Sequence, residues 1–125
     1  MKLRVALVDD STDTLEVLSL LYSQRDDVLL VGTAKTLEEA QELVGETEVD
    51  VLSLDIRIGN RNGIDLCKAV HRDFPQVYIS MCSLESDDVM MRIAEEAGAH
   101  YFMAKPVSLQ DIDLMLGHCH SLREA

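Results

Sequence analysis

The chain has 125 residues, 47% of them hydrophobic, and a formal net charge of −12 at pH 7. The length fits one domain, and the apolar content is sufficient to build a core. The sequence has no run of about 18 apolar residues, which excludes a membrane-spanning helix. The excess of acidic residues argues against nucleic-acid binding or an anionic-membrane surface, since such surfaces need clustered Lys and Arg. We therefore expect a single domain over residues 1–125.

In the first half of the chain, helix-capping residues separate apolar segments. Ser11 or Thr12 can cap a helix that follows the first strand. Thr36 and Glu39, three residues apart, have the form of a capping box at the start of a second helix. Gly45 is placed to end that helix.

In the second half, the same signals recur. A helix is predicted at 64–74, where a proline stops it, and another at 89–97, with Ser86 as its N-cap and a glycine after its end. Ser108 caps the last helix, with an acidic residue three positions later.

Five apolar segments of strand length alternate with these helices. The predicted strands cover residues 3–8, 28–33, 49–54, 77–82 and 101–104. The third is almost entirely apolar, which is typical of a strand in the middle of a parallel sheet. Strict alternation predicts a parallel sheet with helices on both faces. We therefore expect an α/β fold of the flavodoxin-like (βα)5 type, with the strand order 2-1-3-4-5.

The three cysteines, Cys67, Cys82 and Cys119, are odd in number and scattered. They indicate reduced thiols, and with the absence of a signal-peptide pattern they favour a cytoplasmic protein. His118 and His120 flank Cys119, but residues one and two apart do not share a helix face. That spacing disfavours a metal site there.

Polar side chains follow four of the predicted strands. They are Asp9 and Asp10 after the first, Asp55 after the third, Ser83 after the fourth and Lys105 after the fifth. The carboxyl ends of parallel strands meet at one edge of a sheet, so we expect these side chains to converge. Taken singly, each has an ordinary alternative, such as an aspartate that starts a turn or caps a helix.

Three ionised carboxylates at one edge repel one another. Either one of them takes up a proton, or a cation offsets their charge. Mg²⁺ suits the second solution because it prefers oxygen ligands and leaves positions for water and phosphate. A lysine and a hydroxyl beside the carboxylates form a pocket suited to a phosphoryl group.

With these motifs the sequence resembles a response-regulator receiver domain of two-component signalling, over residues 3–120. The resemblance is carried by three segments: 8–11, 54–55 with a glycine eight positions on, and 98–106. It implies that Asp55 accepts a phosphoryl group from a sensor histidine kinase or a histidine phosphotransfer protein. Lys105 would then pair with Asp55 and its phosphoryl group.

The resemblance also implies a metal site and a switch. Mg²⁺ would be held by Asp9, Asp10, Asp55 and the backbone carbonyl of Arg57. The switch hydroxyl would be Ser83, which lies 22 residues before Lys105, with Ser80 as a weaker rival. The aromatic switch residue would be Phe102. The two would reshape the face formed by the fourth helix, the fifth strand and the fifth helix.

That face implies partners: a downstream effector or output domain, or a second copy in a phosphorylation-dependent homodimer. No output domain follows the last predicted helix, so we expect a stand-alone receiver or the receiver of a longer regulator. Such a domain catalyses only its own phosphoryl uptake and hydrolysis. The fourth helix has more apolar residues than one buried stripe needs, which suggests a partner surface there; they are Val89, Met90, Met91 and Ile93.

Two departures from the usual receiver pattern carry expectations. Gly59 stands where proline is usual, so the loop 59–63 is expected to be looser. Leu84 follows the switch hydroxyl where small residues are typical, and we expect it to slow access to the phosphoryl group. Arg57 and Glu85 are expected to pair across the mouth of the site.

Other functions fit the residues less well. A hydrolase of the haloacid-dehalogenase kind needs a second aspartate two positions after the nucleophile, where this chain has Arg57. A flavodoxin-like cofactor binder needs a phosphate loop after the first strand, where Asp9 and Asp10 would repel phosphate. A receiver-like interaction module that is never phosphorylated remains the alternative, although every acid, hydroxyl and lysine position is filled.

Overall fold

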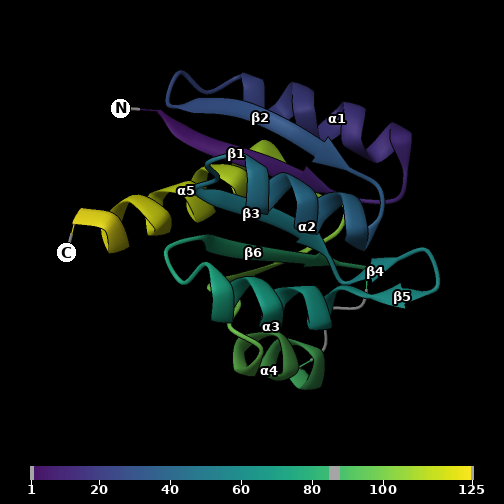
Figure 1. Cartoon of the computed structure of the whole chain (residues 1–125). Coiled ribbons are helices and arrows are strands. Elements are labelled where there is room, and N and C mark those ends of the chain that lie inside the picture. The colour runs from purple at the N-terminus through teal and green to yellow at the C-terminus, as the bar shows by residue number, and fades with distance from the viewer. Residues whose placement is uncertain (1, 85–87, 125) are drawn as a thin grey trace.

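The computed structural model describes residues 2–84 and 88–124 (Figure 1). The strands are β1 Leu3–Val8, β2 Val28–Ala34, β3 Val51–Asp55, β4 Arg57–Ile58, β5 Arg61–Asn62, β6 Tyr78–Ser83 and β7 Tyr101–Ala104. The helices are α1 Thr12–Ser23, α2 Leu37–Glu46, α3 Gly63–Asp73, α4 Asp88–Glu96 and α5 Leu109–Glu124. No helix within the described ranges has both the length and the hydrophobicity to cross a bilayer.

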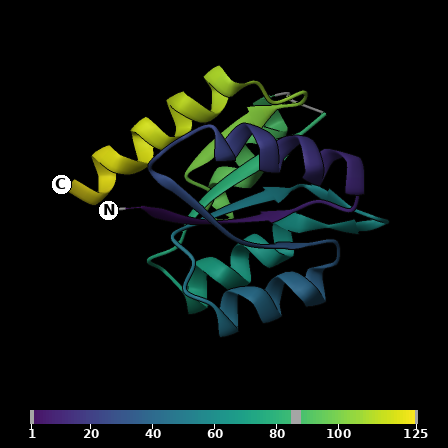
Figure 2. The ribbon, with the colours of Figure 1, turned by 90° about the horizontal axis from the view of Figure 1, so that it is seen from above.

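Five strands form one parallel sheet in the order β2-β1-β3-β6-β7. Counted along this sheet the order is 2-1-3-4-5, so the predicted (βα)5 flavodoxin-like fold is confirmed. Helices α1 and α5 cover one face, and α2, α3 and α4 cover the other (Figures 1 and 2). Every residue of β3 and β6 is buried, as expected for the central strands of a sheet covered on both sides.

Alternate side chains of each central strand enter two separate apolar layers. Leu52 and Leu54 of β3 pack under α2, α3 and α4. Val51, on the same strand, packs on the other side with Ile112 and Leu116 of α5. Full burial of each such side chain contributes about 1.5–3 kcal/mol to folding. Both layers are needed to hold the strand ends that carry the polar residues.

Three predicted N-caps are present. The hydroxyls of Ser11, Thr36 and Ser108 accept hydrogen bonds from backbone amides three residues on, at 3.1–3.2 Å. The predicted cap Ser86 lies outside the described residues. The prediction that Gly45 ends α2 is wrong, because that helix continues to Glu46. A glycine inside a helix costs only about 1 kcal/mol relative to alanine, so the packed apolar face of α2 overrides it.

The loop at 59–63 is not loose, contrary to expectation. Strands β4 and β5 form an antiparallel hairpin with Gly59 at its turn, in the left-handed region at φ +64°. Asn62 then caps α3 by accepting a hydrogen bond from the Ile64 amide at 2.8 Å. A Cβ on Gly63 would lie 2.4 Å from the backbone oxygen of Asp55, so only glycine lets α3 begin this close to β3.

Candidate functional site

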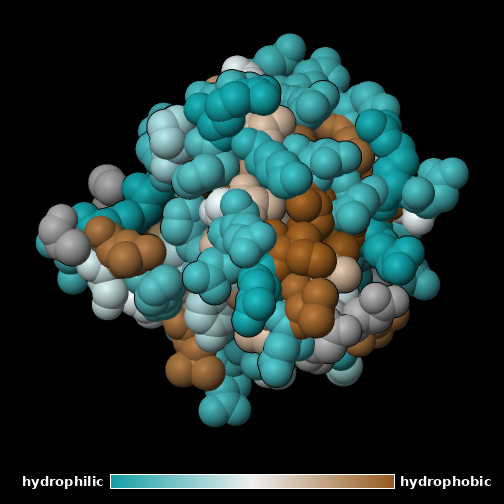
Figure 3. All heavy atoms as spheres, turned by 90° about the horizontal axis from the view of Figure 1, so that it is seen from below, coloured by the Kyte–Doolittle hydropathy of each residue, from teal (hydrophilic) through white to brown (hydrophobic). Residues whose placement is uncertain are grey.

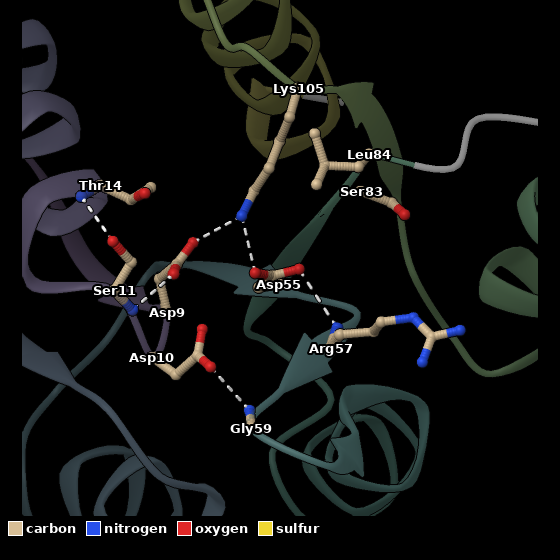
Figure 4. Close-up of a pocket in the computed structure, with 10 residues that line it drawn as sticks. All are labelled: Asp9, Asp10, Ser11, Thr14, Asp55, Arg57, Gly59, Ser83, Leu84 and Lys105. Atoms are coloured by element: carbon tan, nitrogen blue, oxygen red, sulfur yellow. Dashed lines mark hydrogen bonds and ion pairs between the residues drawn. The ribbon is translucent and has the colours of Figure 1, made fainter.

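A pocket of about 340 Å³ opens at the carboxyl ends of β1, β3, β6 and β7. It is lined by Asp9, Asp10, Ser11, Thr14, Asp55, Arg57, Gly59, Ser83, Leu84 and Lys105 (Figure 4). All five strand-end residues singled out in the sequence line this one pocket. The reason is topological: β1 and β3 are neighbours at the centre of the sheet, where the order of the strands reverses.

Lys105 joins two of the carboxylates. Its Nζ lies 2.7 Å from Oδ2 of Asp9 and 2.7 Å from Oδ2 of Asp55. Both aspartates are buried, at 2% and 8% exposure. Two buried carboxylates this close require a shared counter-charge, which the ammonium group supplies. Burial by itself lowers the pKa of Lys105, but its hydrogen bonds to Asp55 and Asp9 outweigh burial and raise the pKa, so the lysine stays charged.

Asp55 is the last residue of β3, so its side chain sits at the rim while its backbone belongs to the sheet. Its second oxygen, Oδ1, accepts a hydrogen bond from the Arg57 amide at 3.2 Å. Burial raises the pKa of Asp55, and the charge of Asp9 adds to this, while Lys105 opposes it. The carboxylate is therefore oriented by two donors but incompletely stabilised.

Asp9 and Asp10 are held in different ways. Oδ1 of Asp9 accepts from the Ser11 amide at 2.9 Å, within the turn that starts α1. Asp10 is exposed, and its Oδ2 accepts from the Gly59 amide at 2.9 Å, so the β4–β5 hairpin positions it from outside the sheet. The sequence pattern alone did not reveal this role of Gly59, since a backbone amide leaves no signature in residue type.

The three carboxylates form a group that suits a divalent cation. One oxygen of each of Asp9, Asp10 and Asp55 lies within 4.8 Å of the others. Among the described residues, the cation bonded to these carboxylates is the ammonium group of Lys105, so negative charge is in excess there. An all-oxygen donor set with this excess charge fits Mg²⁺ better than softer metals. The Arg57 side chain does not supply the missing charge, because it points away from the carboxylates in Figure 4.

Ser83 lines this pocket, whereas Phe102 lines a different groove, between α4 and β7. Ser83 was expected in a loop but is the last residue of β6, paired with Ala104, and its backbone carbonyl accepts from the Lys105 amide at 2.8 Å. In Figure 4 its hydroxyl is turned away from Asp55. Phe102 is half-buried against the core under α4. The rival Ser80 is fully buried within β6, with no hydrogen-bond partner for its hydroxyl among the described residues.

Leu84 stands at the mouth of the pocket with 81% of its surface exposed, beside Lys105. It also lines a second, apolar groove of about 390 Å³ between α1 and the segment after β7. The expected pairing of Arg57 with Glu85 cannot be placed, since Glu85 lies outside the described residues.

The histidine–cysteine run near the carboxyl end of the chain has separate contacts. Nδ1 of His118 lies 2.6 Å from the hydroxyl of Tyr78, Nε2 of His120 lies 2.8 Å from Asp27, and Cys119 is buried. The three side chains point to different parts of the molecule, as the helical spacing predicts.

Known proteins match this chain over nearly its whole length. The family model of the response regulator receiver domain matches residues 5–116. Protein-glutamate methylesterase/protein-glutamine glutaminase 1 of Albidiferax ferrireducens is 36% identical over 107 residues, covering 84% of this chain and 28% of that protein. Transcriptional regulatory protein LnrK of Bacillus subtilis is 28% identical over 119 residues, covering 95% and 54%. The chain thus spans less than a third of the methylesterase and about half of LnrK.

Among solved structures, the response regulator domain of Thermotoga maritima CheB superposes with a TM-score of 0.80 at 30% identity. It covers all of this chain and 96% of that one. The signal receiver domain of the putative response regulator NarL from Mycobacterium tuberculosis gives 0.86 at 26% identity, covering 95% and 97%. With the family model spanning most of its length, this chain belongs to the response regulator receiver domain family.

Proposed function

We propose that Asp55 accepts a phosphoryl group from the phosphohistidine of a sensor histidine kinase or a histidine phosphotransfer protein. The P–N bond of the donor breaks, a P–O bond forms to a carboxylate oxygen of Asp55, and the leaving imidazole takes a proton. The observation that supports this most strongly is the position of Lys105, 2.7 Å from both Asp55 and Asp9 in a pocket with excess negative charge.

The chain's own groups prepare Asp55 for this transfer. The Arg57 amide and Lys105 fix the orientation of the carboxylate, so that little reorganisation is needed as the new bond forms. Lys105 also offsets charge on the transferring oxygens. Asp9, Asp10, Asp55 and the backbone carbonyl of Arg57 would hold Mg²⁺. The bound ion supplies the positive charge that a phosphoryl group requires at this rim.

Phosphorylation would be read out at the α4–β7–α5 face. New phosphoryl oxygens give the Ser83 hydroxyl an acceptor near Asp55, and its movement would open space for Phe102. On this face Val89, Met91 and Ile93 of α4 are 41–68% exposed. Figure 3, which looks onto the side that α4 covers, shows a patch of apolar atoms near the centre of the surface. We infer that a downstream effector, an output domain or a second phosphorylated copy docks there.

We further propose that residues 1–125 act as one receiver domain in the cytoplasm. Catalysis would be limited to its own phosphoryl uptake and hydrolysis. A module that binds partners without phosphorylation would have no use for the charge excess at the pocket, where Asp9 and Asp55 are buried and share the charge of one lysine with each other.

Intact-protein mass spectrometry after incubation with acetyl phosphate tests this proposal. We expect the mass of one phosphoryl group to be added with Mg²⁺ and not with EDTA. Asp55→Asn should abolish the addition. Asp26→Asn is the matched control, because Asp26 is exposed at the other end of the sheet. Equal labelling of wild type and Asp55→Asn would refute the assignment.

A further inference from the structure

A second cluster of ionisable rings lies at the amino end of β6 and β7, opposite the pocket. The ring of Tyr78 stacks on that of His100, with centroids 5.0 Å apart and planes at 19°. His71 of α3 meets His100 edge-on at 6.2 Å. Nδ1 of His118 on α5 lies 2.6 Å from the Tyr78 hydroxyl, within hydrogen-bond distance. The half-buried imidazole of His100 thus contacts rings from β6 and α3, and His118 of α5 joins the cluster through Tyr78.

His100 extends the β6–β7 pairing by one step. The regular register begins at Ser80 and Tyr101. One position earlier, the His100 amide donates to the Ile79 carbonyl at 2.8 Å, and the Ile79 amide donates to Nδ1 of His100 at 3.0 Å. The imidazole therefore takes the place of a backbone carbonyl. Because β7 is an edge strand of only four residues, this extra bond is a sizeable part of its attachment.

This bond exists in one protonation state only. Nδ1 must be unprotonated to accept, so the ring proton of the neutral form is on Nε2. Protonation places an N–H of the ring against the N–H of Ile79, and the bond is lost. We propose that His100 is a proton-sensitive latch, which holds the start of β7 to β6 when neutral and releases it when charged.

The surroundings of His100 favour the neutral form. Burial lowers its pKa, and His71 and His118 add to the shift. Burial raises the pKa of Tyr78, which keeps its hydroxyl protonated. Two groups oppose release: the face of the Tyr78 ring attracts a cation, and Glu95 of α4 lines the same groove. Tyr101 also lines this groove.

The latch bears on the strand that leads to the phosphorylation pocket. His100 and Phe102 line one groove of about 460 Å³ between α4 and β7, and Lys105 directly follows β7. Release would loosen the wall against which Phe102 packs. The latch itself needs no phosphorylation. Its test can therefore fail while the proposed phosphorylation of Asp55 holds, and the latch can hold while that proposal fails.

NMR titration of the unphosphorylated chain from pH 7.5 to 5.0 tests the latch. We expect the ring of His100 to titrate below its ordinary pKa of 6.5. The amide shift of Ile79 should follow with the same midpoint. The unfolded chain then binds the proton first, so the melting temperature should fall as the pH drops through 6.5.

His100→Asn separates the bond from the charge, since Oδ1 of asparagine can accept from the Ile79 amide but does not titrate. This variant should lose the Ile79 titration and show a smaller acid-induced fall in melting temperature. His120→Asn is the matched control, because His120 faces Asp27 instead, and the Ile79 titration should persist in it. The proposal would be overturned if the amide shift of Ile79 did not change as His100 is protonated. It would also be overturned if the acid-induced fall in melting temperature were the same in His100→Asn as in wild type.

Discussion

Two aspartates at opposite ends of the sheet show how differently this fold treats a carboxylate. Asp27, before β2, bonds to both Arg25 and His120, and Arg25 foremost holds its pKa well below its ordinary value. Asp55, after β3, shares one lysine with Asp9, and burial raises its pKa. At the amino end one guanidinium meets two carboxylates, Asp27 and Asp113, whereas at the carboxyl end one ammonium group meets a cluster of three, which is a larger deficit of positive charge. That deficit marks the end that takes a ligand.

The largest expected effect comes from removing the shared cation. Lys105→Met should slow phosphoryl uptake from acetyl phosphate on the order of 100-fold, the usual cost of losing one preorganised donor at a developing charge. Initial labelling rates at saturating Mg²⁺ measure this. Lys68→Met, which removes an exposed lysine on α3, is the control. A rate within twofold of wild type in Lys105→Met would show that the lysine is only structural.

Next in size is the effect of weakening the cation site. Asp10→Asn keeps an acceptor for the Gly59 amide but removes one negative charge. The Mg²⁺ concentration needed for half-maximal thermal stabilisation should rise about 10-fold or more, since ligand-shell substitutions commonly cost 10–100-fold in affinity. This measurement uses the unphosphorylated protein. Equal Mg²⁺ dependence in the two proteins would remove Asp10 from the site.

At the amino end of the sheet, the effects should be on stability alone. Arg25→Met should lower the free energy of unfolding at pH 7 by about 1 kcal/mol, because Arg25 joins Asp27 to Asp113 in a partly exposed network. The pKa of Asp27 is depressed from 3.8, so this contribution is present above pH 3.8 and is lost as the pH falls below it. Urea unfolding at pH 7 and pH 3 should show the difference from wild type shrinking. A difference that is constant with pH would contradict this.

The smallest expected effect concerns access to the pocket. Leu84→Ala should speed decay of the phosphorylated protein a few-fold, because the apolar side chain at the mouth keeps water from the acyl phosphate. Leu114→Ala, an equally conservative change at an exposed leucine of α5, should leave decay unchanged. Identical lifetimes for wild type and Leu84→Ala would count against a gating role.

The sequence was sufficient to predict the strand order, because the pattern of apolar residues indicates where each strand lies and ends. It was also sufficient to predict that the strand-end residues meet, namely Asp9, Asp10, Asp55, Ser83 and Lys105. What could not be predicted depends on backbone geometry. The hairpin that orders the segment after β3 rests on two strands of two residues each, of which Ile58 alone is apolar and buried. The bond from His100 to the Ile79 amide likewise depends on register, and a lone histidine in a sequence does not reveal it.

The central claim is that Asp55 is the phosphorylated residue. Borohydride reduction of an acyl phosphate converts the aspartate that carries it to homoserine, which peptide mapping locates. After treatment with acetyl phosphate and Mg²⁺ we expect homoserine at position 55 and nowhere else, and none when Mg²⁺ is withheld. Homoserine at another aspartate, or at position 55 regardless of Mg²⁺, would contradict the claim.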